Sequence, residues 1–475
     1  MRKHSLVLLA GAFAISLFGA GFARPQITIP TGQPKDPGPR GAPIGAGQPV
    51  AGLTADQLAF FNDGAARFSS PDTVPTGLGP LFNATFCAQC HSQPAVGGSS
   101  PSAAAFPFIG PNPQVADATA DGATNTLPPF ITADGPVREA RFLFVPNANG
   151  TNSSTPDGGV HDLFSITGRS DAAGCQLAQP DFAQAIAQKN IIFRIPTPTF
   201  GLGLIENIYN ETIVANANSN AALKAALGIN GHPNSATPNV SGNTGSITRS
   251  GWKAQNPSGG LFSGEAYSVE VGVSNEIFTV EREEPPAFSH PLPPGCILNS
   301  YPEDTTNFLA PGSDVTQIPS DIVAFANFMR LLDQPAPAPL TLETAAGKAA
   351  FVKIGCALCH TPSFMTGESD VAPALSHVQA NLFSDLLVHD MGTGLADGVT
   401  QGAAGPQDFR SAPLWGVGQR VFFLHDGRCG PSNGGLVCAI QAHASSGSEA
   451  NGVISNFNRL PISGKQSIVD FLRSL

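Results

Sequence analysis

Two short strings contain the residue types needed to hold an iron cofactor covalently. They are Cys87-Ala-Gln-Cys90-His91 and Cys356-Ala-Leu-Cys359-His360. The CxxCH spacing sets two thiols one helical turn apart, where they can bond the vinyl groups of a haem while the histidine ligates iron. Zinc sites and thioredoxin-like motifs also use CxxC, but the adjoining histidine favours haem. We therefore expect two covalently attached haem c groups, with His91 and His360 as iron ligands.

A second pair of residues occupies matching positions after the two motifs. Glu270 lies eighteen residues beyond Trp252, and His443 lies eighteen residues beyond His425. Imidazole is a good sixth ligand, so we expect His443 to make the haem of His360 (haem 2) an electron carrier, with Met391 as the rival ligand. A carboxylate ligates ferric haem poorly, so Glu270 should leave the haem of His91 (haem 1) open and handle protons beside it. The alternatives are a loop histidine and a structural ion pair.

Two further side chains are candidates for roles around the haems. An indole between two haem edges can carry an electron, so Trp252 is a candidate relay; the alternative is a core tryptophan. Arg428 follows His425-Asp426-Gly427, and its guanidinium could pair with a haem propionate. The alternative for that string is a simple turn.

The repeat extends to the elements that must position these residues. Phe82 and Phe351 each lie five residues before the first cysteine of a motif. Both 198–203 and 413–418 read P-x-(F/W)-G-x-G, and each half ends in a stretch with apolar residues at helical spacing, 320–332 and 465–475. The pattern predicts a mainly α protein with two duplicated cytochrome c-like haem domains. Long irregular loop insertions are expected at 147–159 and 216–256.

The chain divides into five segments. Residues 1–23 have a basic start, an apolar run and small residues at the end, which is typical of a signal peptide; an uncleaved anchor helix is the alternative. A flexible Pro/Gly-rich leader is expected at 24–52, an N-terminal haem domain at 53–334, a Pro-rich linker at 335–340 and a C-terminal haem domain at 341–475. The protein is therefore expected in the periplasm.

The remaining cysteines and the charge limit the function further. Cys175, Cys296, Cys429 and Cys438 stand outside the haem motifs and are disulfide candidates in an oxidising compartment. Three pairings are possible, of which 175–296 with 429–438 keeps each bridge inside one domain; free buried thiols are the alternative. The net charge is -11 and no basic run exists, so nucleic acid is not an expected partner.

The motifs resemble those of the bacterial di-haem cytochrome c peroxidase superfamily. The most similar branch is that of the di-haem oxidoreductases, also labelled thiol oxidoreductases. The resemblance rests on Gly251-Trp-Lys-Ala254, Val388-His-Asp-Met-Gly392, Phe423-Leu-His-Asp-Gly427 and Ala439-Ile-Gln-Ala-His443. It implies a Trp between the haems and a Glu serving the peroxidatic N-terminal haem, roles that Trp252 and Glu270 match.

The chain also departs from the peroxidases. They place a Met on the C-terminal haem, whereas this chain offers His443, as the distantly similar latex-cleaving di-haem oxygenases do. That ligand would lower the potential of haem 2. No histidine lies between His91 and His161 to bind resting haem 1, so reductive gating by that route is not expected. The Ca²⁺ that the relatives hold between domains has no diagnostic loop here.

The expected activity is peroxidase-like. Hydrogen peroxide would be the small-molecule oxidant, and electrons would be exchanged with a soluble periplasmic partner. Glu270 would be the acid–base residue, with Glu206 as its rival. The alternatives are oxidation or oxygenation of an organic substrate at haem 1, and a non-catalytic electron-transfer protein in which both irons are six-coordinate. The sequence favours no particular oligomeric state.

Overall fold

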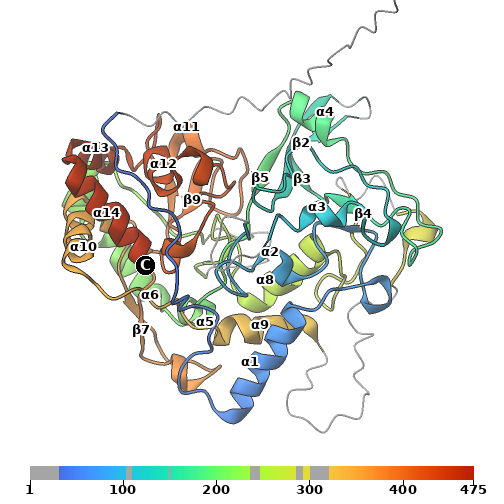
Figure 1. Cartoon of the computed structure of the whole chain (residues 1–475), viewed down its shortest axis with the longest axis horizontal. Coiled ribbons are helices and arrows are strands. Elements are labelled where there is room, and N and C mark those ends of the chain that lie inside the picture. Colours follow the sequence, from blue (N-terminus) through green and yellow to red (C-terminus); the bar gives the residue numbers. More distant parts are fainter. Residues whose placement is uncertain are drawn as a thin grey trace, which may run out of the picture.

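A computed structural model describes residues 31–102, 110–147, 149, 151–235, 246–284, 292–299 and 320–475. The predicted signal peptide lies outside these residues. Within them the protein is helix-rich, with small antiparallel sheets (Figure 1). None of the described helices is both long and apolar enough to cross a membrane.

The helices in chain order are α1 Ala55–Phe68, α2 Cys87–Cys90, α3 Gln114–Asp117, α4 Phe182–Ala187, α5 Leu202–Glu206, α6 Asn210–Asn218, α7 Ala221–Leu227, α8 Gly259–Ala266, α9 Asp321–Leu331, α10 Leu342–Ile354, α11 Gly392–Leu395, α12 Gly435–Ala442, α13 Asn451–Arg459 and α14 Ile462–Ser474. The strands are β1 Leu81–Phe82, β2 Glu139–Pro146, β3 Asn152–His161, β4 Phe164–Ser165, β5 Ile192–Arg194, β6 Phe364–Met365, β7 Gln379–Ala380, β8 Val388–Asp390 and β9 Asp408–Arg410. A π-helix, η3, spans Tyr267–Val271 and continues α8.

Two pairs of helices pack closely against each other, α1 with α9 in the N-terminal half and α10 with α14 in the C-terminal half. A glycine allows the close approach in each pair. A Cβ at Gly64 would overlap the Ala324 carbonyl, and a Cβ at Gly347 would overlap the Ser467 carbonyl. Helices α9 and α14 are the two closing helices predicted from apolar spacing, and Ser320 caps α9 through the backbone N–H of Val323.

The repeated P-x-(F/W)-G-x-G strings contact these closing helices in the same way. The last glycine of each string packs on a carbonyl near the helix end, Gly203 on Arg330 and Gly418 on Arg473. A side chain at either glycine would collide with the helix backbone. The spacing of the string is therefore explained by a close approach of backbone to backbone.

One match within the predicted repeat was wrong. Phe351 packs beside His360, with ring centroids 6.3 Å apart, but the equivalent neighbour of His91 is Phe68, at 6.1 Å. Phe82 instead lies in β1 and packs on Phe164. Phe68 and Phe351 each lie four residues after the glycine at their helix crossing, Gly64 or Gly347. The two phenylalanines are therefore equivalent in their position within the helix, although their distances from the motif cysteines differ.

The insertion of the N-terminal half is more regular than predicted. Residues 152–159 of the expected loop 147–159 belong to β3, which pairs antiparallel with β2, and β2 pairs in turn with β5. Strand β2 buries Ala140 and Phe142 on alternate positions, so its apolar face holds the polar β3 in the sheet. Part of the second expected loop, 216–256, is also helical, in α6 and α7.

The segment 31–52 is not the flexible leader that its composition predicts. It runs along the C-terminal half before entering α1 (Figure 1). Asp36 forms a two-pronged ion pair with Arg473 at 2.7 Å, the Ala336 N–H donates to the Gly45 carbonyl at 2.6 Å, and the Val50 N–H donates to Leu331 at 2.8 Å. Backbone groups without a helix or sheet of their own are thus satisfied by both halves.

Both disulfides join residues within one half of the chain. Cys175 bonds Cys296, and Cys429 bonds Cys438. This is the pairing that the predicted domain boundaries favoured. The largest apolar cluster nevertheless contains residues of both halves, among them Phe68, Phe328, Leu375 and Leu386, so the halves share a core.

Candidate haem sites

Two cavities contain the two CxxCH motifs. The first, cavity 1, is lined by Cys87, Cys90 and His91 among other residues. The second, cavity 2, is lined by Cys356, Cys359 and His360 among other residues. Each motif therefore presents both of its thiols and its imidazole to one cavity.

The four motif cysteines are free thiols, whereas the other four form disulfides. Burial raises the pKa of each thiol in Cys87, Cys90 and Cys356, that of Cys356 to about 12. A buried thiol facing a cavity suits attachment to a group inside it. The thiols therefore fit the covalent role predicted for them.

His91 has the tautomer that a metal ligand needs. Its Nδ1–H donates to the Gly98 carbonyl at 3.1 Å, which leaves the Nε2 lone pair free. Burial lowers the pKa of His91 to about 4, so the ring is neutral at neutral pH. The Nε2 atom faces the Glu270 carboxylate across cavity 1, with 3.9 Å between Nε2 and Oε2.

Two histidines face one another across cavity 2. The Nδ1–H of His360 donates to Phe383 at 3.0 Å, and that of His443 donates to Ala439 at 2.7 Å, so both Nε2 atoms are free. Their ring centroids are 6.5 Å apart. Metal–imidazole bonds are about 2.0–2.1 Å long, so this separation leaves room for one metal between two rings. Burial lowers both pKa values, that of His360 to about 4 with a contribution from His443.

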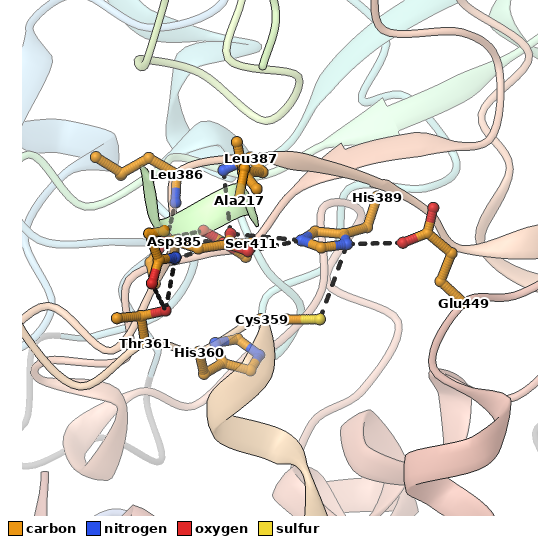
Figure 2. A network of polar contacts seen from close by, with 12 residues as sticks. Ala217, Cys359, His360, Thr361, Asp385, Leu386, Leu387, His389, Ser411 and Glu449 are labelled. Atoms are coloured by element: carbon orange, nitrogen blue, oxygen red, sulfur yellow. Dashed lines mark hydrogen bonds and ion pairs between the residues drawn. The ribbon is translucent and has the colours of Figure 1, made fainter. Parts of the chain in front are cut away.

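His389 shows a different pattern, with both ring nitrogens occupied. Figure 2 shows it between Asp385, 3.1 Å from Nε2, and Glu449, 2.8 Å from Nδ1, with the Cys359 sulfur 3.8 Å from Nδ1. His389 therefore contacts the second motif through Cys359 and has no ring nitrogen free for a metal. The rival ligand Met391 also lines cavity 2, where it packs against the cluster that contains Trp252 and Phe409.

Glu270 lies in η3, where the helix widens to an i→i+5 repeat. Burial raises its pKa to about 8, and the nearby carboxylates Glu139 and Glu265 add to the rise. The rival Glu206 does not line cavity 1. Its carboxylate pairs with Arg330 at 2.7 Å and accepts the Gly259 N–H at 2.6 Å.

Glu265 is a residue that the sequence analysis missed. It lines cavity 1 together with Glu270, although it belongs to α8 and lies five residues earlier. In a regular α-helix residues five apart point in different directions. Only the π-helical turn, which no sequence pattern indicated, brings both to the same cavity.

Trp252 lines both cavities. Its indole Nε1–H donates to the Ile195 carbonyl at 2.8 Å, and its ring meets the His425 ring edge to face with centroids 6.4 Å apart. His425 stacks in turn on Phe409 at 4.3 Å. The indole thus has the position that a relay between two cofactors requires.

Buried arginines with unpaired N–H groups face the cavities. Within the described structure, Arg410 Nε and both Nε and Nη2 of Arg420 have no hydrogen-bond partner, and both side chains line cavity 2. Arg194 Nε is similarly unpaired and lines cavity 1. Buried cationic donors require anionic partners, and haem propionates would supply them. This donor set supports the fit of haem to both cavities.

Arg428 was predicted for that propionate role, and the structure does not bring it to either cavity. Its Nε pairs with Asp426 at 2.7 Å and its Nη1–H donates to the Gly394 carbonyl at 2.7 Å. The side chain stabilises its own turn. Among the described residues no cluster of three His, Cys, Asp or Glu side chains could hold a separate metal ion.

A family model described as "Di-haem oxidoreductase, putative peroxidase" matches residues 149–475. The chain belongs to this family, and haem is accordingly its cofactor. The match contains Trp252, Glu270, the second CxxCH motif and His443, while the first motif precedes it. The family is one of di-haem oxidoreductases.

Two solved structures are also similar to the chain. Hydrazine synthase of Kuenenia stuttgartiensis is 18% identical over 33% of this chain and 56% of its own, with a TM-score of 0.21. A MauG-like protein associated with microbial copper homeostasis is 15% identical over 34% of this chain and 55% of its own, with a TM-score of 0.22. The chain thus spans a little over half the length of each. No curated protein matches the sequence.

Proposed function

We propose that the protein is a periplasmic c-type peroxidase with two duplicated haem domains, in which cavity 1 is the reaction site and cavity 2 relays electrons. The observation that carries the proposal is the contrast across the two motif histidines. A carboxylate faces His91, and an imidazole faces His360. An imidazole closes an iron site, whereas a carboxylate leaves it accessible.

The geometry supports specific roles for the residues of cavity 1. When bound, haem supplies the redox centre at which the peroxide O–O bond is broken. His91 would hold the haem iron through its free Nε2. Glu270 moves one proton from the inner to the outer oxygen of the peroxide, so that the outer oxygen leaves as water. Reduction of one peroxide to two waters consumes two protons and two electrons.

The residues around cavity 2 suit electron delivery. His360 and His443 would both ligate the iron of the second haem, and the unpaired groups of Arg410 and Arg420 would pair with its propionates. Trp252 carries the electron between the cavities, both of which it lines. The electrons come from a soluble periplasmic donor, since the 1–23 segment directs the chain to export.

The proposal predicts that Glu270→Gln slows peroxide cleavage by about a hundredfold or more, because the amide keeps the shape but cannot accept the proton. Rapid mixing of peroxide with the reduced-haem-2 protein measures the rate, and an unchanged cyanide affinity shows that the cavity is intact. Glu206→Gln is the matched control, since Glu206 is a half-buried carboxylate that does not line cavity 1.

A normal rate in Glu270→Gln would contradict the proposed proton transfer. Failure of cyanide and peroxide to bind the wild-type protein at all would instead identify a six-coordinate electron-transfer protein. The two results are distinguishable because only the second removes ligand binding.

A further inference from the structure

The second carboxylate of cavity 1 has surroundings unlike those of the structural carboxylates nearby. Glu265 Oε2 accepts a hydrogen bond from Asn256 Nδ2 at 2.7 Å, and within the described residues this is its one hydrogen bond. Among the described residues no ion pair holds it, whereas Glu206 is paired with Arg330. Asn256 is fully buried and fixes one oxygen of Glu265, whose side chain lines the cavity.

Glu265 and Glu270 share cavity 1 with charged residues of β2. The wall of cavity 1 formed by β2 contains Glu139 and Arg141. Both affect the pKa of Glu265, which is raised by burial first and by Glu139, and lowered by Asn256 and Arg141. Arg141 pairs with Asp157 at 2.8 Å, and the Asp157 side chain is 47% exposed. The polar groups therefore continue from the cavity to the surface of the β2–β3 hairpin.

Glu270 alone cannot complete a peroxidase cycle. It returns the proton that it takes from the peroxide, but two more protons per peroxide must enter from bulk water to form two waters. Residues of α8, η3 and the β2–β3 hairpin line cavity 1, so protons that cross this lining while the cavity holds its cofactor need a carrier among its side chains. Carboxylates that are not fixed in an ion pair can carry them.

We propose that Glu265 is a proton-relay residue, which exchanges protons between Glu270 and the β2 wall of cavity 1. The inference rests on the proposed peroxidase function and deepens it. Glu265 acts through Glu270 and does not touch the peroxide. Its role follows from the π-helical turn, which sets both carboxylates on one cavity, and from its single hydrogen bond to Asn256.

The test separates the first peroxide cleavage from sustained turnover. In Glu265→Gln the first cleavage, followed by rapid mixing, should keep its wild-type rate, because Glu270 is intact. Steady-state reduction of peroxide with ascorbate as the electron source should fall by about tenfold or more. Rising phosphate concentration should restore it, since a small buffer can replace a lost relay. Glu206→Gln should show neither the loss nor the rescue.

A binding measurement gives a readout without turnover. Cyanide enters as HCN and releases a proton when it binds ferric haem. In wild type, the proton detected by a pH-indicator dye should appear together with the spectral change of haem 1. In Glu265→Gln the spectral change should keep its amplitude while the dye signal lags. Glu265→Asp, which keeps a carboxyl group and tests folding, should remove most of the lag.

Wild-type turnover and a synchronous dye signal in a folded Glu265→Gln protein would overturn the relay and leave the proposed function standing. A slow variant that phosphate does not rescue would assign Glu265 a structural role. If Glu270→Gln also cleaves peroxide normally, the peroxidase proposal itself fails.

Discussion

Cavity 1 and cavity 2 present the same kind of histidine to different partners. His91 and His360 each donate Nδ1–H to a backbone carbonyl and keep Nε2 free. Across the cavity the first faces Glu270 and the second faces His443. The surrounding frame is alike as well, with Phe68 or Phe351 beside the histidine. Around the two motif histidines the main difference is therefore the residue that faces each of them.

The walls differ in a way that matches those partners. Cavity 1 is bounded by carboxylates and arginines of β2, α8 and η3, whereas the lining of cavity 2 is mainly aliphatic and aromatic, with residues such as Leu436, Ile440 and Phe457. Proton exchange needs polar groups near the reacting centre. Electron transfer needs only rigid packing. A protein with two sites can therefore assign proton exchange to one cavity and electron transfer to the other by changing the lining residues, while the helices around each motif stay alike.

Removal of a motif cysteine should have the largest effect on the comparison. Cys87→Ser should leave a protein whose only covalent haem is that of cavity 2, and Cys356→Ser should leave only that of cavity 1, because each haem depends on both thioethers of its own motif. The haem bound to the denatured chain, measured by mass, should fall from two groups to one. A wild-type chain without covalent haem would contradict both sites.

Substitution of Glu270 and His443, the residues that face the motif histidines, should reverse which haem iron is open to cyanide. His443→Gly should open haem 2 to cyanide and lose a low-spin signal, while Glu270→His should give haem 1 a second imidazole and close it. Optical and EPR spectra of both variants measure the change. If His443→Gly stays low-spin and Met391→Leu does not, Met391 is the ligand.

Substitution of Trp252, which lines both cavities, should have a smaller effect. Trp252→Phe keeps an aromatic ring but loses the readily oxidised indole and the hydrogen bond to Ile195. Transfer between the haems, followed after mixing the half-reduced protein with peroxide, should become slower while both resting spectra stay unchanged. Equal rates would reduce Trp252 to a packing residue.

The sequence predicted the parts of the site that have rigid spacing. The disulfide partners and the closing helices are confirmed by the structure. The CxxCH motifs, Glu270 and His443 line the two cavities, and their roles stay predictions. In each case the spacing reflects a helical turn or a repeated contact, which a linear pattern can record.

The residues that were missed depend on irregular backbone. Glu265 reaches cavity 1 through a π-helical turn, and Phe68 is separated from its cysteine by an insertion that hides its match to Phe351. Arg410, Arg420 and the segment 31–52 are placed by contacts with residues far away in the sequence. Composition alone predicts a flexible segment at 31–52, because it does not reveal that Asp36 pairs with Arg473.

The EPR spectrum of the as-isolated ferric protein, recorded with and without cyanide, tests the division between the cavities most directly. We expect a high-spin haem in cavity 1 that cyanide converts to low spin. We expect the haem in cavity 2, with two histidine ligands, to be low-spin and unchanged by cyanide. Two low-spin signals that cyanide does not alter would contradict this division, since neither cavity would then offer an open iron.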